Sequence, residues 1–177
     1  MEHLTVATPG VADIDELAAV AARTFPLACP PTAAPENVVV FIDENLSADR
    51  FAEYLADDDR VVLAAYEDGR IVGYCMMIRG LPDDADVQRA VTLRPSLELS
   101  KMYVLPDSHG GEVSARLMDA VLERAAAMAV ESVWLGVNQR NRRAQRFYTK
   151  HGFTINGTKT FRLGDGIEND YVMVRPV

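Results

Sequence analysis

The segment SKMYVLPDSHGGEVSARLMDAVLERA, from Ser100 to Ala125, decides the fold of this chain. It begins as an apolar, strand-like run, passes through the glycine pair Gly110-Gly111, and continues with apolar residues at helical spacing. A helix that starts directly after such a turn has unpaired backbone N–H groups at its positive end, which suit a phosphate or pyrophosphate. The glycine pair alone also fits a tight strand-to-helix turn without a ligand. The segment therefore predicts a strand–turn–helix unit with a candidate anion site at its turn.

Two common phosphate-binding loops do not match this turn. A Walker loop ends in Gly-Lys-Ser/Thr, and a dinucleotide-binding fingerprint has three spaced glycines and an acidic residue after the next strand. Neither pattern occurs in the sequence. The turn therefore belongs to neither of these classes.

The composition describes one acidic globular domain. The chain has 177 residues, of which 49% are hydrophobic, enough for one substantial core and too few for two ordinary domains. Its formal net charge of -8 argues against sequence-independent nucleic-acid binding, because such binding depends on Lys and Arg side chains that neutralise phosphates. Cationic partners such as amines fit this charge better.

The sequence predicts no membrane anchor, metal site or disulfide. No apolar run approaches the roughly 20 residues that span a bilayer, and the N-terminus MEHLTVATPG lacks the pattern of a signal peptide. Cys29 and Cys75 have no metal-ligand spacing and lie in apolar surroundings, which predicts buried free thiols in a reducing compartment. We therefore expect a cytoplasmic protein without membrane contact.

Hydrophobic periodicity and turn residues predict an alternation of helices and strands. In chain order these are helices at 13–25, 36–46 and 47–57, the last capped by Ser47, then a hairpin of strands 61–66 and 71–78 around Asp68-Gly69, a polar surface excursion at 79–95, a strand at 97–105, the helix after the glycines, a strand at 132–137, a helix at 141–151 closed by Gly152, and a hairpin of 154–163 and 170–177 across a loop at 164–169. This order predicts an α/β or α+β domain around a mixed sheet.

A second segment, NRRAQRFYTKHGF from Asn141 to Phe153, completes a pattern with the first. Together with ELSKMYVLP, HGGEVS and VWLGV, it resembles the GNAT superfamily of acetyl-CoA-dependent N-acetyltransferases. In that superfamily a strand ending in YVLP leads into a phosphate-binding loop, a helix, another strand, and a helix of the form N-x-x-A-x-x-F-Y. The resemblance implies a single domain over 1–177, with a mixed, mostly antiparallel sheet flanked by helices. Acetyl-CoA would bind a core at about 98–153, and helices at about 11–57 would border the acceptor.

The resemblance places the pyrophosphate of acetyl-CoA on main-chain N–H groups of the loop after the strand. The cofactor-binding candidates there are His109, Gly110, Gly111, Glu112, Val113 and Ser114. The family pattern Gln/Arg-x-x-Gly-x-Gly/Ala has a glycine where this chain has Glu112. A carboxylate opposes pyrophosphate binding unless its side chain turns to solvent. Glu112 also fits an exposed acid in the first turn of the helix.

The resemblance also implies how the acetyl end of the cofactor is held. Backbone groups of Met102, Tyr103 and Val104 would bind the acetyl carbonyl and the pantetheine arm, and Asn141 would contact that arm. Unpaired backbone donors are the usual means of stabilising an oxyanion. These residues complete the set of cofactor-binding candidates.

An acid and a base are needed for amine attack on a thioester. By resemblance, Tyr148 would protonate the departing thiolate, and Glu98 is the candidate base, directly or through a water. Tyr148 alternatively fits a core aromatic beside Phe147, and Glu98 alternatively fits a solvent-facing acid at a strand end. Both alternatives stay open at this point.

The acceptor is predicted only as a class. A primary amine of a small molecule suits the acidic chain, and the closing hairpin resembles that of bacterial acetyltransferases of the PaiA type, whose substrates include polyamines. A protein or peptide amine, or a non-catalytic acyl-CoA-binding module of the same fold, are the alternatives. The resemblance implies direct transfer in a ternary complex, and the motif contains no cysteine that could serve as a covalent nucleophile. A homodimer is one option for assembly.

Overall fold

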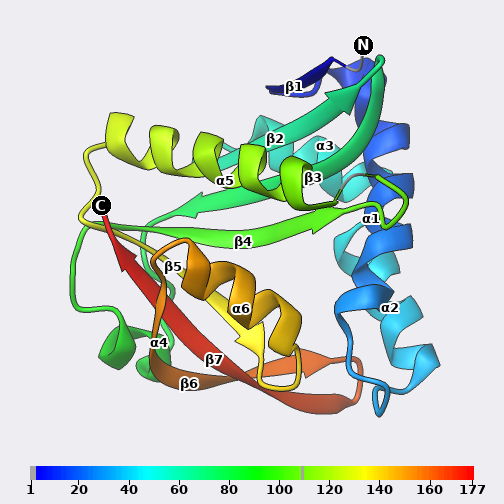
Figure 1. Cartoon of the computed structure of the whole chain (residues 1–177). Coiled ribbons are helices and arrows are strands. Elements are labelled where there is room, and N and C mark those ends of the chain that lie inside the picture. The colour runs from blue at the N-terminus through cyan, green and yellow to red at the C-terminus, as the bar shows by residue number, and fades with distance from the viewer. Residues whose placement is uncertain (1–2, 109) are drawn as a thin grey trace.

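The computed structural model describes residues 3–108 and 110–177, which form a seven-stranded mixed sheet flanked by helices (Figure 1). The strands are β1 (Leu4–Ala7), β2 (Arg60–Glu67), β3 (Arg70–Arg79), β4 (Ser96–Val104), β5 (Ser132–Asn138), β6 (Thr154–Leu163) and β7 (Gly166–Pro176). Their spatial order is β1-β2-β3-β4-β5-β7-β6. Neighbouring strands are antiparallel except for the parallel pair β4 and β5. The predicted mixed, mostly antiparallel fold is confirmed.

Helices cover both faces of this sheet (Figure 1). They are α1 (Ile14–Ala28), preceded by a short turn of 3-10 helix at Val11–Asp13, α2 (Pro35–Asn45), α3 (Ala48–Ala56), α4 (Ala85–Ala90), α5 (Gly110–Ala127) and α6 (Arg142–Lys150). Apolar side chains of α5 and α6 pack into one core, and those of α1, α2 and α3 pack into a second core on the opposite face. Across the described residues, no helix has the length and apolar character needed to cross a membrane.

Local sequence signals set several element ends as predicted. Ser47 caps α3, because its Oγ accepts a hydrogen bond of 3.2 Å from Arg50 N. Asp68 and Gly69 turn the β2–β3 hairpin with φ values of 53° and 80°. Gly152 follows α6 with a φ of 92°, a conformation that glycine adopts without strain.

The closing hairpin differs from the prediction. Leu163 pairs directly with Gly166, so the turn is Gly164-Asp165 and not the whole stretch 164–169. Residues 166–169 belong to β7 and alternate between half-buried and exposed positions at the edge of the sheet. The prediction was wrong because polar side chains on this edge hide the apolar alternation that marks a strand. The β6–β7 hairpin therefore has a longer ladder than predicted.

The strands β4 and β5 separate soon after they meet. Their parallel ladder consists of three residue pairs, the last of which joins Glu98 to Trp134. A bulge lies just beyond this point, because Met77 pairs with Leu99 and Met76 pairs with Lys101, which leaves Ser100 as an extra residue in β4. An extra residue bends its strand and increases the local twist. The sheet therefore opens between β4 and β5.

Candidate active site

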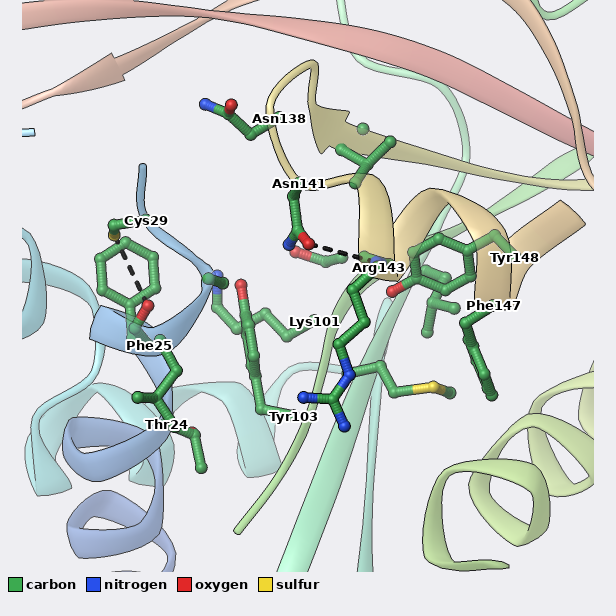
Figure 2. Close-up of a pocket in the computed structure, with 18 of the residues that line it drawn as sticks. Thr24, Phe25, Cys29, Lys101, Tyr103, Asn138, Asn141, Arg143, Phe147 and Tyr148 are labelled. Atoms are coloured by element: carbon green, nitrogen blue, oxygen red, sulfur yellow. Dashed lines mark hydrogen bonds between the residues drawn. The ribbon is translucent and has the colours of Figure 1, made fainter. Parts of the chain in front are cut away.

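The opening between β4 and β5 leads into a cavity of about 700 Å³, here called the cleft. Such a volume is typical of a small-molecule site. Side chains from α5 and α6 line the cleft on one face of the sheet, and side chains from α1, α2, β6 and β7 line it on the other. Figure 2 shows Phe25 of α1 and Cys29, which follows α1, on one side and Phe147 and Tyr148 of α6 on the other. The cleft therefore reaches both faces of the sheet.

Backbone groups of β4 face the cleft. Leu105 N–H donates to Val72 O of β3 at 2.8 Å, so strand alternation directs the N–H groups of Met102 and Val104 away from β3. β5 no longer pairs with this part of β4. The predicted residues Met102 to Val104 all line the cleft. Their backbone is available to a ligand, as an oxyanion site requires.

The start of α5 forms one end of the cleft. Gly111 and Ser114 line it, and nothing lies within 4 Å of the place where a Cβ on Gly111 would be. α5 begins at Gly110, so the N–H groups of its first turn have no partner within the helix. His109, also predicted to contact the cofactor, lies outside the described residues. The first turn of α5 thus offers both open space and backbone donors.

Two further residues of this turn point elsewhere. Glu112 is exposed, and its place in the first turn of α5 is one that favours an acidic side chain. The Val113 side chain is fully buried in the core beneath α5, so only its backbone could meet a ligand. The exposed side chain of Glu112 meets the condition under which a carboxylate tolerates a nearby pyrophosphate.

The first turn of α6 contributes Asn141 and Arg143 to the cleft (Figure 2). Asn141 is the N-cap of α6, because its Oδ1 accepts a hydrogen bond of 3.1 Å from Ala144 N. This bond fixes the side chain and leaves the amide Nδ2 for a ligand. Arg143 is exposed on α6 and lines the cleft, where a guanidinium suits a phosphate group.

Tyr148 packs on the core and also lines the cleft. Its ring centroid lies 5.5 Å from that of Phe147 and 5.8 Å from that of Phe153, in edge-on arrangements. Burial raises the pKa of Tyr148 to about 12, with a further contribution from Cys75. The phenol therefore keeps its proton at neutral pH, which is the state needed to donate it.

Glu98 and Lys101 lie on the same face of β4. Leu99 points into the core beneath α5, whereas Tyr103 belongs to the core of the opposite face. Side chains alternate between the two faces of a strand, so Glu98 points away from the face of Leu99. Lys101 lies two residues before Tyr103 and therefore shares the face of Tyr103. Glu98 and Lys101 are three residues apart, which in a regular strand would place them on opposite faces. The extra residue at Ser100 brings them to the same face. Both charged side chains therefore line the part of the cleft that α1, α2, β6 and β7 border. This part is called the acceptor side, after the role expected from the sequence.

Burial shifts both of these groups toward their neutral forms. It raises the pKa of Glu98, and Lys101, Lys159 and Arg60 oppose part of that rise. It lowers the pKa of Lys101 to about 8, against the attraction of Glu98. Glu98 is half-buried in the cleft and not solvent-facing. Its environment thus favours proton uptake more than that of an exposed glutamate does.

Cys29 is half-buried in the cleft, which corrects the prediction that both thiols are buried in the core. The prediction was wrong because α1 ends at Ala28, so the next residue lies at the mouth of the cleft. Cys75 is fully buried as predicted. Burial, and then Glu168, raise the pKa of Cys29 to about 11, so its thiol is protonated and a weak nucleophile at neutral pH.

Several residues of the acceptor side were not singled out from the sequence. Lys159 and Asp170 form an ion pair of 3.7 Å between β6 and β7. Phe41 stacks on Phe25 with ring centroids 4.4 Å apart and lies 5.4 Å from Phe161. These residues come from α1, α2 and the closing hairpin, which meet only in the folded chain. The charged residues Lys159 and Asp170, within the otherwise strand-like hairpin sequence, were the one sign of a site there.

Comparisons with known proteins agree with this geometry. The sequence model of the Acetyltransferase (GNAT) family matches residues 23–153. The chain belongs to the GNAT family. A GNAT relative in Mycobacterium tuberculosis, an uncharacterized N-acetyltransferase, is 62% identical over 163 residues, which cover 92% of this chain and 97% of that protein. An uncharacterized N-acetyltransferase of Lactobacillus delbrueckii is 23% identical over 91% of this chain and 90% of its own length.

Solved structures share the GNAT fold at low sequence identity. The PaiA N-acetyltransferase of Thermoplasma acidophilum in complex with coenzyme A superposes with a TM-score of 0.78 at 16% identity, over 99% of each chain. The ribosomal-protein-S18-alanine N-acetyltransferase of Escherichia coli superposes with a TM-score of 0.69 at 17% identity, over 99% of this chain and 94% of that one. At these identities the likeness shows the fold alone and does not define the acceptor.

Proposed function

We propose that this GNAT protein transfers the acetyl group of acetyl-CoA to the primary amine of a small molecule, by direct attack within a ternary complex. The observation that carries the proposal is the unpaired backbone of β4 beside Tyr148 in a single cleft. Backbone donors there can stabilise the negative charge that forms on a thioester oxygen, and a buried phenol can protonate a thiolate.

The cleft offers groups for each part of acetyl-CoA. The first turn of α5, with Gly111 and Ser114, suits the pyrophosphate. Arg143 is placed to attract a phosphate of the same ligand. The backbone from Met102 to Val104 and the amide of Asn141 can hydrogen-bond the amide groups of the pantetheine arm.

The transfer removes protons from the acceptor nitrogen and adds one to the thiolate sulfur. The ammonium of the acceptor loses a proton to Glu98, directly or through a water, and the free amine attacks the thioester carbonyl. The C–N bond forms, the C–S bond breaks, and the departing thiolate takes the proton of Tyr148. The new amide nitrogen loses its second proton, which returns through water to the phenolate of Tyr148, and Glu98 releases its proton to solvent. Tyr148 thus starts in the protonated state that its burial favours, and Glu98 starts ionised with a raised affinity for the proton that it takes.

The acidic residues of the acceptor side support an amine acceptor. Glu98, Glu168 and Asp170 all line the cleft. Their charge favours a cation, and polyamines are one candidate class. The cleft of about 700 Å³ has the size of a small-molecule site, in keeping with a small acceptor.

Calorimetric titration of the purified chain with acetyl-CoA, and with CoA as the product, tests the proposal. We expect micromolar affinity, on the order of -8 kcal/mol. Thiol release is then measured with spermidine, amino acids and short peptides as acceptors. No heat at millimolar acetyl-CoA would refute the proposal. Binding without thiol release from any of these amines would support a non-catalytic acyl-CoA-binding module instead.

A further inference from the structure

On the acceptor side of the cleft, one lysine has no ion-pair or hydrogen-bond partner among the described residues. Lys101 lines the cleft, and its Nζ lies 5.6 Å from the ring centroid of Phe41. Within the described residues, no carboxylate lies within 4.0 Å of this ammonium and no group accepts a hydrogen bond from it. A half-buried ammonium without acceptors is costly, and an anionic group of a ligand would compensate it.

Glu98 lies next to this lysine along the same face of β4. The two residues pair with Ile78 and Met76, which are two positions apart on β3. Two positions on a strand correspond to about 6.6 Å. The cleft thus presents one negative and one positive side chain at neighbouring positions. A ligand with an ammonium and a carboxylate on adjacent carbons matches this spacing.

The other carboxylates of the acceptor side have partners within the protein. Asp170 is paired with Lys159 at 3.7 Å, and the two side chains are only 10% and 16% exposed. Gly136 makes room for this pair, because a Cβ there would lie 3.1 Å from Asp170 Oδ2. Glu168 accepts a hydrogen bond of 3.2 Å from the amide of Asn138. The ion pair with Lys159 cancels the charge of Asp170, which leaves fewer free carboxylates for a polycation.

Aromatic rings form a wall beside these charges, with the Nζ atoms of Lys101 and Lys159 5.6 Å and 5.7 Å from the ring centroids of Phe41 and Phe161. Phe25, Phe41 and Phe161 come from three different elements. Phe41 stacks on Phe25 with ring centroids 4.4 Å apart, and the ring of Phe161 is tilted against Phe41 at 5.4 Å. Such a wall binds an apolar or aromatic group and offers a polyamine little besides its methylene chain. Figure 2 shows Lys101 and Tyr103 between Phe25 of α1 and Asn141 of α6.

We propose that the acceptor of this enzyme is a zwitterionic amino acid with an apolar or aromatic side chain, whose ammonium faces Glu98 and whose carboxylate binds Lys101. The side chain lies against the wall of Phe25, Phe41 and Phe161. The inference rests on the proposed acetyl transfer and narrows its acceptor. Lys101 is then a specificity-determining residue, and the acetylated amine lies next to the β4 backbone that holds the thioester.

The test compares probes that differ only in the carboxylate. L-phenylalanine, L-phenylalaninamide and spermidine are titrated calorimetrically into the full chain, with and without CoA, and are assayed as acceptors by thiol release. We expect L-phenylalanine to exceed its amide at least tenfold in affinity and in kcat/KM, because a charge-assisted hydrogen bond to Lys101 is lost in the amide. Spermidine should bind more weakly than L-phenylalanine.

Two variants locate the effect. Lys101→Met keeps the aliphatic stem against Phe41 and should lower the affinity for L-phenylalanine about tenfold while changing that for the amide less than twofold. Arg162→Met removes the same charge from the exposed side of β6, next to Phe161, and should leave the preference intact. Thermal unfolding checks both variants. If Lys101→Met does not fold, the wild-type preference for acid over amide decides the inference.

The outcomes separate this inference from the proposed function. Equal binding of acid and amide, preference for spermidine, or no affinity for the carboxylate-bearing probe would overturn the zwitterionic acceptor while leaving acetyl transfer to other amines intact. A complete lack of acetyl-CoA binding would refute the proposed function, and the titrations without CoA would still decide whether the acceptor side prefers a carboxylate.

Discussion

Burial keeps the hydroxyl of Tyr148 protonated, which is the state that a proton donor requires. Its pKa of about 12 means that it loses its proton only at strongly alkaline pH. Tyr148→Phe keeps the ring contacts with Phe147 and Phe153 and removes only the hydroxyl. We expect kcat to fall about 100-fold, because positioned proton donors contribute about 10²–10⁴-fold.

Steady-state kinetics measures the fall in kcat, and calorimetry measures the affinity for acetyl-CoA, which should not change. Such a pattern identifies an interaction made only in the transition state. If Tyr148→Phe retained full kcat, Tyr148 would be a packing residue and another group, or water, would protonate the thiolate.

The buried environment of Glu98 raises the free energy of its ionised form and so lowers the stability of the folded chain. Burial raises its pKa above 4.5, so the folded chain holds the proton more tightly than the unfolded chain does. The ionised carboxylate therefore destabilises the free protein above its folded pKa, and this cost disappears below its unfolded pKa. Glu98→Gln removes this cost and should raise the melting temperature at pH 7.

The same variant should lower kcat/KM about 100-fold, in the range of a lost general base. Melting curves at neutral and acidic pH, together with the pH dependence of kcat/KM, measure both effects. The wild-type rate should rise with pH through the raised pKa of Glu98, and the variant should lack this rise. A variant that is both less stable and fully active would contradict the assignment.

Among the elements, β4 carries the feature that most affects function. Its bulge at Ser100 separates it from β5 while the pairing with β3 continues on either side. Deleting Ser100 should restore a regular β3–β4 ladder and straighten the strand. We expect a folded protein with at least tenfold weaker binding of acetyl-CoA, because the straightened β4 narrows the cleft.

Circular dichroism and calorimetry check the deletion. Ser100→Ala keeps the extra residue and should bind acetyl-CoA as the wild type does. Undiminished affinity in the deletion would mean that the separation of β4 and β5 does not depend on the bulge.

The elements show what the sequence could and could not predict. Apolar periodicity predicted α5 and the β2–β3 hairpin, and Ser47 and Gly69 correctly marked the start of α3 and the turn of that hairpin. The bulge at Ser100 was not predicted, because no residue type marks it. Without it, the common face of Glu98 and Lys101 could not be inferred. The ion pair of Lys159 and Asp170 was also missed, since it depends on the register of β6 and β7.

For the molecule as a whole, ligand binding should appear as added stability. The β4–β5 ladder of three residue pairs is the direct link between the two parts of the sheet, and a ligand in the cleft contacts both. At 100 times its Kd, a ligand stabilises the folded state by about 2.7 kcal/mol. Acetyl-CoA should then raise the melting temperature by about 5–10 °C in differential scanning fluorimetry. Adenosine alone serves as a control, and an equal shift with adenosine would place the main contacts outside the cleft.

A cleft that reaches both faces of the sheet also bears on the order in which two reactants arrive. α5 and α6 border one entrance, and α1, α2 and the β6–β7 hairpin border the other. Neither reactant has to pass through the space that the other occupies, so the architecture imposes no compulsory sequence of addition. Double-reciprocal plots of velocity should form intersecting lines, and either product should be able to depart first.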